Sequence, residues 1–237
     1  MLWRAVVRTD PEQGESIRKS KALEQSAVAA ARDLRTEGWG KDSLSGKERN
    51  RLFLNLKGHQ FADVSMISGA DDKADGRSVA VWDYDRDGWS DLVVVNANAP
   101  RLGIFHNQVS KILTGSGQPG NRRGVIAFKF IGGNSKAMAS SEWSNRDGYG
   151  VRLEVGLKDG TVLLREHRCG EGFATQNSEI ILMGIGEQSG VERVLVNSPS
   201  GKVQELGKIN AGKLIHLYEN PAESPPTMQI YSSGTTK

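Results

Sequence analysis

The sequence predicts a mainly β protein, and three observations support this prediction. Short stretches of β-branched and aliphatic residues recur along the 237 residues, with turns between them. Glycine occurs 28 times, which suits a chain that turns often. A loop of alternating aspartates lies between residues 78–82 and 92–95, and both of these stretches have the composition of strands.

The N-terminal segment, residues 1–40, is predicted to differ from the rest because residues 15–35 are rich in helix-forming side chains. Gly38 can end this helix. The apolar residues at helical spacing form only a thin face, so the helix needs a partner surface. These residues are Leu23, Ala27, Ala30, Ala31 and Leu34.

Residues 41–110 are predicted to form a first β region. A short strand pair is expected at residues 51–55 and 60–64, because a turn containing Lys57-Gly58 separates them. The hairpin with the aspartate loop follows. Another strand is expected at residues 102–106. Residues 111–124 then form a linker loop rich in glycine.

Residues 125–220 are predicted to form an antiparallel β-sandwich or barrel. Val151, Leu153 and Val155 alternate with polar residues, as in a strand with one buried face. Turn residues recur between the predicted strands, for example at residues 158–161. Several short strands at regular spacing are typical of compact antiparallel folds. The tail, residues 221–237, is expected to be disordered.

The stretch that carries the clearest chemistry is the loop from Asp83 to Asp91. Its aspartates occupy positions one, three, five and nine, and Gly88 occupies position six. Alternate carboxylates in a tight turn repel one another unless a hard cation lies between them, and Ca²⁺ takes six to eight oxygen ligands. We therefore expect a calcium site with side-chain ligands and one backbone carbonyl. The expected ligands are Asp83, Asp85, Asp87, Asp91 and the carbonyl of Trp89.

This loop differs from an EF-hand in two ways. Position twelve, which needs a bidentate Glu, is Val94. The flanks read as strands rather than helices, so the loop is expected to join the strands of a β-hairpin. The alternative is an acidic surface turn that binds no metal.

The composition limits the classes of partner and of covalent link that this chain can have. The net charge is only +3 and the basic residues are scattered, so the pI near 9.0 does not indicate nucleic-acid binding. No apolar run is long enough to span a bilayer. The first eight residues are too charged for the core of a signal peptide. Cys169 is the single cysteine, which excludes an intrachain disulfide.

We find no set of residues that predicts catalysis. The four histidines (His59, His106, His167 and His216) lack the spacing of a zinc site. Residues 115–120 match G-x-G-x-x-G, but no strong strand precedes them. Cys169 lies between His167 and Glu171, which allows a thiol nucleophile. The alternative, which we favour, is a small residue beside a glycine-rich turn.

Two blocks of sequence resemble a known family. The first block resembles the FG-GAP/VCBS repeats of cartilage-acidic-protein-like proteins, and the second resembles the ASPIC/UnbV domain that follows those repeats. Together they span most of residues 43–219. The first block comprises Ser45–Asn55, Phe61–Ser65, Ser68–Ala70, Asp75–Arg77 and the aspartate loop; the second comprises Ser144–Val151, Gly170–Gln176, Gly184–Gly186 and Asn197–Gly201.

The resemblance implies a propeller-like, calcium-binding repeat region joined to a small β domain, with the alternating aspartates holding the ion. A propeller needs four to eight blades, and this chain has material for one or two. Lys47 stands where the family pattern leads us to expect histidine. The calcium-bound unit is therefore expected either to pack on the C-terminal domain or to pair with another chain.

The function expected from these observations is a non-enzymatic, calcium-stabilised binding, adhesion or scaffold module. Its partner would be a protein or a glycan, and self-association through open sheet edges is a further expectation. The resemblance implies an extracellular or cell-envelope location. Two alternatives remain open. One is an enzyme or biosynthetic accessory protein with its site at residues 165–176, where a pocket would be lined by His167, Cys169, Glu171 and Gln176. The other is a structural subunit of a larger assembly.

Overall fold

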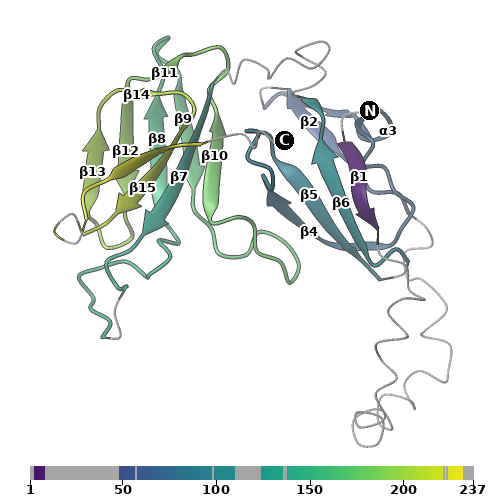
Figure 1. Ribbon diagram of the computed structural model, residues 1–237, viewed down its shortest axis with the longest axis horizontal. Coiled ribbons are helices and arrows are strands. Elements are labelled where there is room, and N and C mark those ends of the chain that lie inside the picture. Colours follow the sequence, from purple (N-terminus) through teal and green to yellow (C-terminus); the bar gives the residue numbers. More distant parts are fainter. Residues whose placement is uncertain are drawn as a thin grey trace, which may run out of the picture. The chain divides into compact units, whose positions relative to one another are not determined.

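The computed structural model describes residues 3–8 (backbone only), 48–56, 58–97, 99–109, 124–135, 138–220, 222 and 224–231. The described part is mainly β, as the sequence predicts (Figure 1). The α-helix α3 (Ser65–Ser68) has a single turn. The predicted helix at residues 15–35, and the G-x-G-x-x-G stretch in the linker, lie outside the described residues.

The chain forms two compact units. The first contains residues 1–80 and 91–109, and the second contains residues 81–90 and 110–237. Two boundaries fall within the hairpin of β4 (Gly76–Trp82) and β5 (Asp91–Asn96), because the loop of this hairpin belongs to the second unit, and a third follows residue 109.

The first unit contains a four-stranded sheet in the order β1-β6-β5-β4 (Figure 1). Both β1 and β5 pair antiparallel with β6. Among the described residues this sheet is open, and a propeller is not shown. The strands are β1 (Trp3–Arg8), β4 (Gly76–Trp82), β5 (Asp91–Asn96) and β6 (Leu102–Asn107).

A separate hairpin confirms the predicted strand pair of this unit. β2 (Phe53–Leu56) pairs antiparallel with β3 (Gln60–Asp63). The turn forms because the side chain of Asn55 accepts a hydrogen bond from the amide of Gly58 at 2.7 Å.

The second unit is sandwich-like and contains two four-stranded sheets. One sheet has the order β13-β12-β8-β9 and the other has the order β10-β7-β15-β16. Apolar side chains of both sheets form one buried cluster, which includes Phe128 of β7, Leu153 of β8 and Ile215 of β15. The strands are β7 (Val125–Ile131), β8 (Arg152–Gly156), β9 (Val162–Glu166), β10 (Ile180–Gly184), β12 (Arg193–Asn197), β13 (Val203–Leu206), β15 (Lys213–Tyr218) and β16 (Thr227–Ile230).

Two short strands complete the second unit: β11 (Gly190–Val191) pairs antiparallel with β14 (Ile209–Asn210). Val191 and Ile209 are buried and belong to the same apolar cluster as the two larger sheets. In the described part of the chain, no helix is both long and apolar enough to cross a bilayer.

One pairing differs from the antiparallel prediction. β15 pairs parallel with β7, from Lys213 opposite Ile126 to Tyr218 opposite Ile131. Parallel neighbours require a long crossover. In the sequence, the strands of the opposite sheet come after β7 and before β15. This long connection allows β15 to run beside β7 in the same direction.

The tail also differs from the prediction of disorder over residues 221–237. β16 pairs antiparallel with β15, and the side chain of Tyr231 is buried against Ala127 and Leu214. Burial of the Tyr231 ring stabilises the end of the strand, because apolar area removed from water contributes about 25 cal/mol per Å². Residues 232–237 lie outside the described residues.

Candidate metal centre

The aspartate loop joins β4 to β5, as the sequence predicts. Its backbone turns sharply, because Arg86 has a φ of 57° and Gly88 a φ of 92°. A Cβ atom at Gly88 would make only an ordinary contact with the Val125 side chain, at 3.4 Å. The backbone conformation, and not a lack of space, therefore favours glycine at this position.

The loop carboxylates accept hydrogen bonds from the loop's own amides. The two oxygens of Asp83 accept from the amides of Asp87, at 3.1 Å, and Gly88, at 3.0 Å. Asp87 accepts from the amide of Trp89 at 2.8 Å. These bonds hold the acidic side chains within the turn, because each satisfies a backbone donor that the turn would otherwise leave unpaired.

Three of the predicted ligands lie together. Single carboxylate oxygens of Asp83, Asp85 and Asp91 all lie within 4.8 Å of one another. Asp83 and Asp91 are buried. Asp91 also accepts a hydrogen bond from the amide of Asn107 at 2.7 Å, which fixes one of its oxygens.

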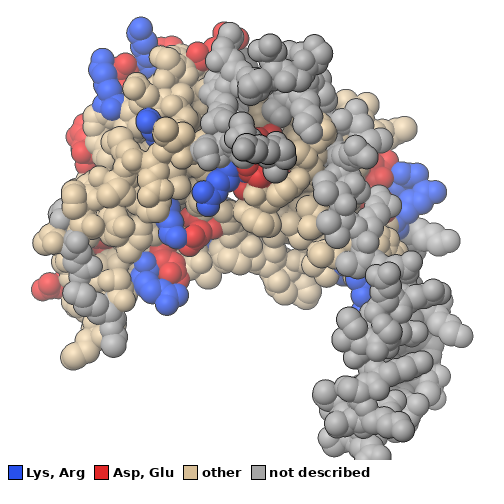
Figure 2. Space-filling model, in the orientation of Figure 1, with Lys and Arg blue, Asp and Glu red and all other residues tan. Residues whose placement is uncertain are grey.

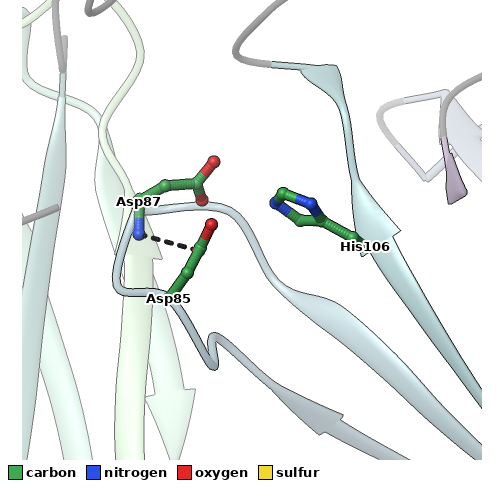
Figure 3. A group of neighbouring side chains, drawn as sticks. All are labelled: Asp85, Asp87 and His106. Atoms are coloured by element: carbon green, nitrogen blue, oxygen red, sulfur yellow. Dashed lines mark hydrogen bonds between the residues drawn. The ribbon is translucent and has the colours of Figure 1, made fainter. Parts of the chain in front are cut away.

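Asp87 belongs to a second group that also contains Asp85 and His106 of β6. Figure 3 shows the imidazole directed towards the two carboxylates, with the hydrogen bond from the Asp87 amide to Asp85 dashed. The carbonyl of Trp89 stays a predicted ligand.

His106 was not among the ligands predicted from the sequence. The pairing of β5 with β6 brings it to the loop, because Leu92 lies opposite Phe105 and the same register places Asp91, the last residue of the loop, opposite His106. Spacing along the chain could not show this, since the two residues belong to different strands.

Burial and the neighbouring carboxylates disfavour the ionised form of Asp83. Burial raises the pKa of Asp83 to about 6; hydrogen bonds from Tyr231 and Gly88 oppose this shift, and the charges of Asp87 and Asp85 add to it. Burial, and then the Asp83 carboxylate, raise the pKa of the Tyr231 hydroxyl. Three converging carboxylates supply the hard oxygen donors that Ca²⁺ prefers, so the residues present fit this ion.

Residues 81–90 are anchored within the second unit by three hydrogen bonds. The amide of Val81 donates to the Asn177 side chain at 2.8 Å, and its carbonyl accepts from the Ser178 amide at 3.1 Å. The Tyr231 hydroxyl donates to Asp83 at 3.0 Å. The loop is therefore positioned by residues far along the chain.

A cavity of about 290 Å³ lies beside this anchor, and every residue that lines it belongs to the second unit. It includes His167 and Glu171, which the sequence reasoning placed in an alternative site. Cys169 and Gln176, the other two members of that site, do not line it. The lining residues are Val81, Trp82, Asp83, Ser90, Arg165, Glu166, His167, Arg168, Glu171, Asn177, Ser178, Ile180, Ile181, Leu182 and Tyr231.

Part of the second unit matches a known protein family. The family model described as ASPIC and UnbV matches residues 141–224. Residues 141–224 form an ASPIC/UnbV domain. The search of curated proteins found no match for the chain. The matched residues include the strands from β8 to β15. β7 precedes them in the sequence but lies between β10 and β15 in one sheet, so it completes a sheet of this domain from outside the matched residues.

A buried glutamate organises one end of the ASPIC/UnbV domain. The carboxylate of Glu219 accepts four hydrogen bonds: from the amides of Gly133 and Ser144, each at 2.8 Å, and from the hydroxyls of Ser144, at 2.7 Å, and Ser200, at 2.5 Å. Burial alone would raise the pKa of Glu219. The hydrogen bonds from Ser200, Gly133 and Ser144 outweigh burial and hold this pKa below its usual value.

Two segments of the ASPIC/UnbV-like block meet at this carboxylate. Ser144 belongs to the segment Ser144–Val151 and Ser200 to the segment Asn197–Gly201, and both donate to Glu219. The His167 ring stacks on Tyr149 of the first of these segments, with the ring centroids 4.8 Å apart. Both segments therefore have structural roles that the short motifs alone did not reveal.

Proposed function

We propose that this chain is a non-enzymatic, calcium-stabilised binding module. The observation that carries the proposal is the convergence of Asp83, Asp85 and Asp91 within 4.8 Å in one loop. Asp83, Asp85 and Asp91 would hold the ion, and Asp87 and the carbonyl of Trp89 would complete the ligand set. Bound Ca²⁺ would supply the positive charge that offsets carboxylate repulsion.

The ion would act through the position of the loop. Asp83 is tied to Tyr231 beyond β16, and Asp91 is tied to the end of β6. An ion that binds both carboxylates would therefore fix the two ends of the loop relative to each other. Binding of the metal only to the folded loop adds to the free energy of unfolding.

Residues 41–110 would be an FG-GAP/VCBS-like repeat region of the cartilage-acidic-protein-like type, and the partner would be a protein or a glycan. We propose an extracellular or cell-envelope location, where millimolar Ca²⁺ suits a site of weak affinity. On the face shown in Figure 2, basic and acidic side chains of the described residues are interspersed, which suits a partner other than nucleic acid.

Self-association is proposed through β4, the strand at one end of its sheet in the described residues. An edge strand offers backbone groups to another chain. The backbone groups of Val81 already bond Asn177 and Ser178, so the pairing would use residues 76–80, where the Val79 side chain is exposed. Light scattering of the full chain tests this part: a monomer at all concentrations would contradict it.

The central experiment is a calcium titration of thermal stability, with magnesium as the control ion. A hundredfold excess of ligand over its dissociation constant adds about 2.7 kcal/mol to the free energy of unfolding. For a chain of this size the melting temperature should rise by several degrees. The double variant Asp83→Ala/Asp85→Ala should lose the calcium-dependent rise. An unchanged melting curve with calcium, or an unchanged rise in the variant, would contradict the proposal.

A second candidate function is an accessory or enzymatic role at residues 165–176. The observation in its favour is the cavity, which His167 and Glu171 line. Cys169 is exposed and does not line the cavity, so a thiol nucleophile acting there is not favoured. Alkylation of Cys169 by iodoacetamide at pH 7 tests whether its thiol is a nucleophile. An alkylation rate far above that of the glutathione thiol would favour an enzymatic role for residues 165–176, and a similar rate would count against it.

A further inference from the structure

The cavity of the second unit combines an aromatic ring with fixed polar groups. Trp82 lines it and is 49% exposed. Its indole and the ring of Tyr84 form an edge-type pair, with centroids 6.1 Å apart and ring planes at 61°. This contact limits the orientations of the indole, whose exposed part offers hydrophobic surface to the cavity.

The polar side chains of the cavity are held by contacts of their own. The Asn177 side chain accepts a hydrogen bond from the Val81 amide and donates one to Glu171. Arg168 donates to Glu166 at 3.2 Å. Planar polar groups that are already oriented lose less conformational entropy when they bind a ligand.

The charges that line the cavity nearly balance. Arg165 and Arg168 are basic, whereas Glu166, Glu171 and Asp83 are acidic. Burial lowers the pKa of His167, so this imidazole is neutral at pH 7. With two basic and three acidic side chains, the site offers many hydrogen bonds and a net charge of only about −1, which gives little attraction for an anion or a cation.

The size and the chemistry of the cavity together limit its ligand. A volume of about 290 Å³ lies at the lower end of the range for ligand pockets, which suits a single small ring. Apolar contacts come from Trp82 and from Ile180 to Leu182, and polar contacts come from guanidinium, carboxylate and amide groups. A neutral pyranose has an apolar C–H face and a rim of hydroxyls, which matches both sets of contacts.

We infer that this cavity binds a neutral saccharide ring that stacks on Trp82, with Asn177, Glu171 and Arg168 contacting its hydroxyls. The inference rests on the proposed binding function and names its ligand class. It adds a role for segment 81–90 besides metal binding, because Trp82 directly precedes the first ligand of the loop.

The test measures binding of glucose, galactose, mannose and N-acetylglucosamine, each alone, to the full chain by saturation-transfer NMR and calorimetry with Ca²⁺ present. We expect one or more of these sugars to bind. Trp82→Ala should weaken binding about tenfold, because an aromatic stack contributes up to about 1.5 kcal/mol. Phe173→Ala removes another exposed aromatic ring that does not line the cavity, and should leave binding unchanged.

Two outcomes would overturn the inference: no binding of any of the four sugars at millimolar concentration, or equal loss of affinity in both variants. The calcium titration of the same samples separates this failure from failure of the proposed function. A calcium-dependent rise in melting temperature without sugar binding leaves the calcium-stabilised module intact and rejects the saccharide. Trp82→Ala should keep the calcium-dependent rise, which shows that the loop is folded.

Discussion

The hydroxyl of Tyr231 donates a hydrogen bond to a carboxylate oxygen of Asp83 at 3.0 Å, although 148 positions separate the two residues in the sequence. Both side chains are buried. A hydrogen bond to a buried carboxylate contributes more than a neutral one. This contact therefore joins the aspartate loop to the strand that ends the described chain.

Replacing Tyr231 with phenylalanine should lower the free energy of unfolding by about 2 kcal/mol, because a buried charged acceptor loses one donor. Urea unfolding measures this change. Tyr149→Phe is the matched control, since the Tyr149 ring stacks on His167 and its hydroxyl makes no hydrogen bond among the described residues. Calcium should still raise the melting temperature of Tyr231→Phe, because the hydroxyl is not a proposed ligand. Equal effects of the two substitutions would contradict the prediction.

The substitution Glu219→Gln should destabilise the chain by about 1–3 kcal/mol, because hydrogen bonds to a buried charged acceptor are lost. The amides of Gly133 and Ser144 share one carboxylate oxygen, and the hydroxyls of Ser144 and Ser200 share the other. A glutamine NH2 group would therefore face either two amide donors or two hydroxyls that must turn to accept. Glu205→Gln is the control, because Glu205 is exposed and its ion pair with Arg193 spans 4.0 Å. Urea unfolding at pH 7 should separate the two variants clearly, and similar midpoints would show that Glu219 has no such role.

Glu219 should also contribute to the loss of stability in acid. Its pKa in the folded chain lies below the usual 4.5, so its contribution is complete above pH 4.5 and declines as the pH falls through the lower, folded-state value. The difference in unfolding free energy between the natural chain and Glu219→Gln should therefore shrink from pH 5 towards pH 3. A difference that stays constant over this range would show that the folded-state pKa is not lowered.

His167 should remain neutral at a lower pH than a solvent-exposed histidine. Burial lowers its pKa, against a hydrogen bond with the Asp147 backbone and the charges of Asp147, Glu171 and Glu179. Because the folded-state pKa lies below 6.5, stability from this residue is complete above pH 6.5 and is lost as the pH falls. An NMR titration of the imidazole should give a midpoint below 6.5. A midpoint at or above that value would contradict the prediction.

Local pattern was enough to predict several elements. The strand pair β2–β3 follows from a turn with glycine between two apolar stretches, and the hairpin with the aspartate loop follows from its β-branched flanks. The grouping of Asp83, Asp85 and Asp91 follows from alternation within one turn. In each case residues close in sequence decide the structure.

Contacts between distant residues could not be predicted in this way. The parallel pairing of β15 with β7 depends on the path of the chain through a second sheet. The four hydrogen bonds to Glu219 join residues from three separate segments, and the burial of Tyr231 depends on Ala127 and Leu214. Alternation of Met228, Ile230 and their polar neighbours was a signal for β16, but the prolines before it favoured a disordered tail.

The two groups of donors in the loop lead to a final prediction about which carboxylate matters more for calcium. Asp91 belongs to the group made only of carboxylates, whereas Asp87 belongs to the group with His106. Asp91→Asn keeps an acceptor for the Asn107 amide and removes one charge from the oxygen site. It should weaken calcium binding roughly tenfold by calorimetry, since affinity follows the charge and number of ligands. Asp87→Asn should have the smaller effect. A larger loss from Asp87→Asn would instead place the ion beside His106, where a nitrogen donor would favour zinc or manganese over calcium.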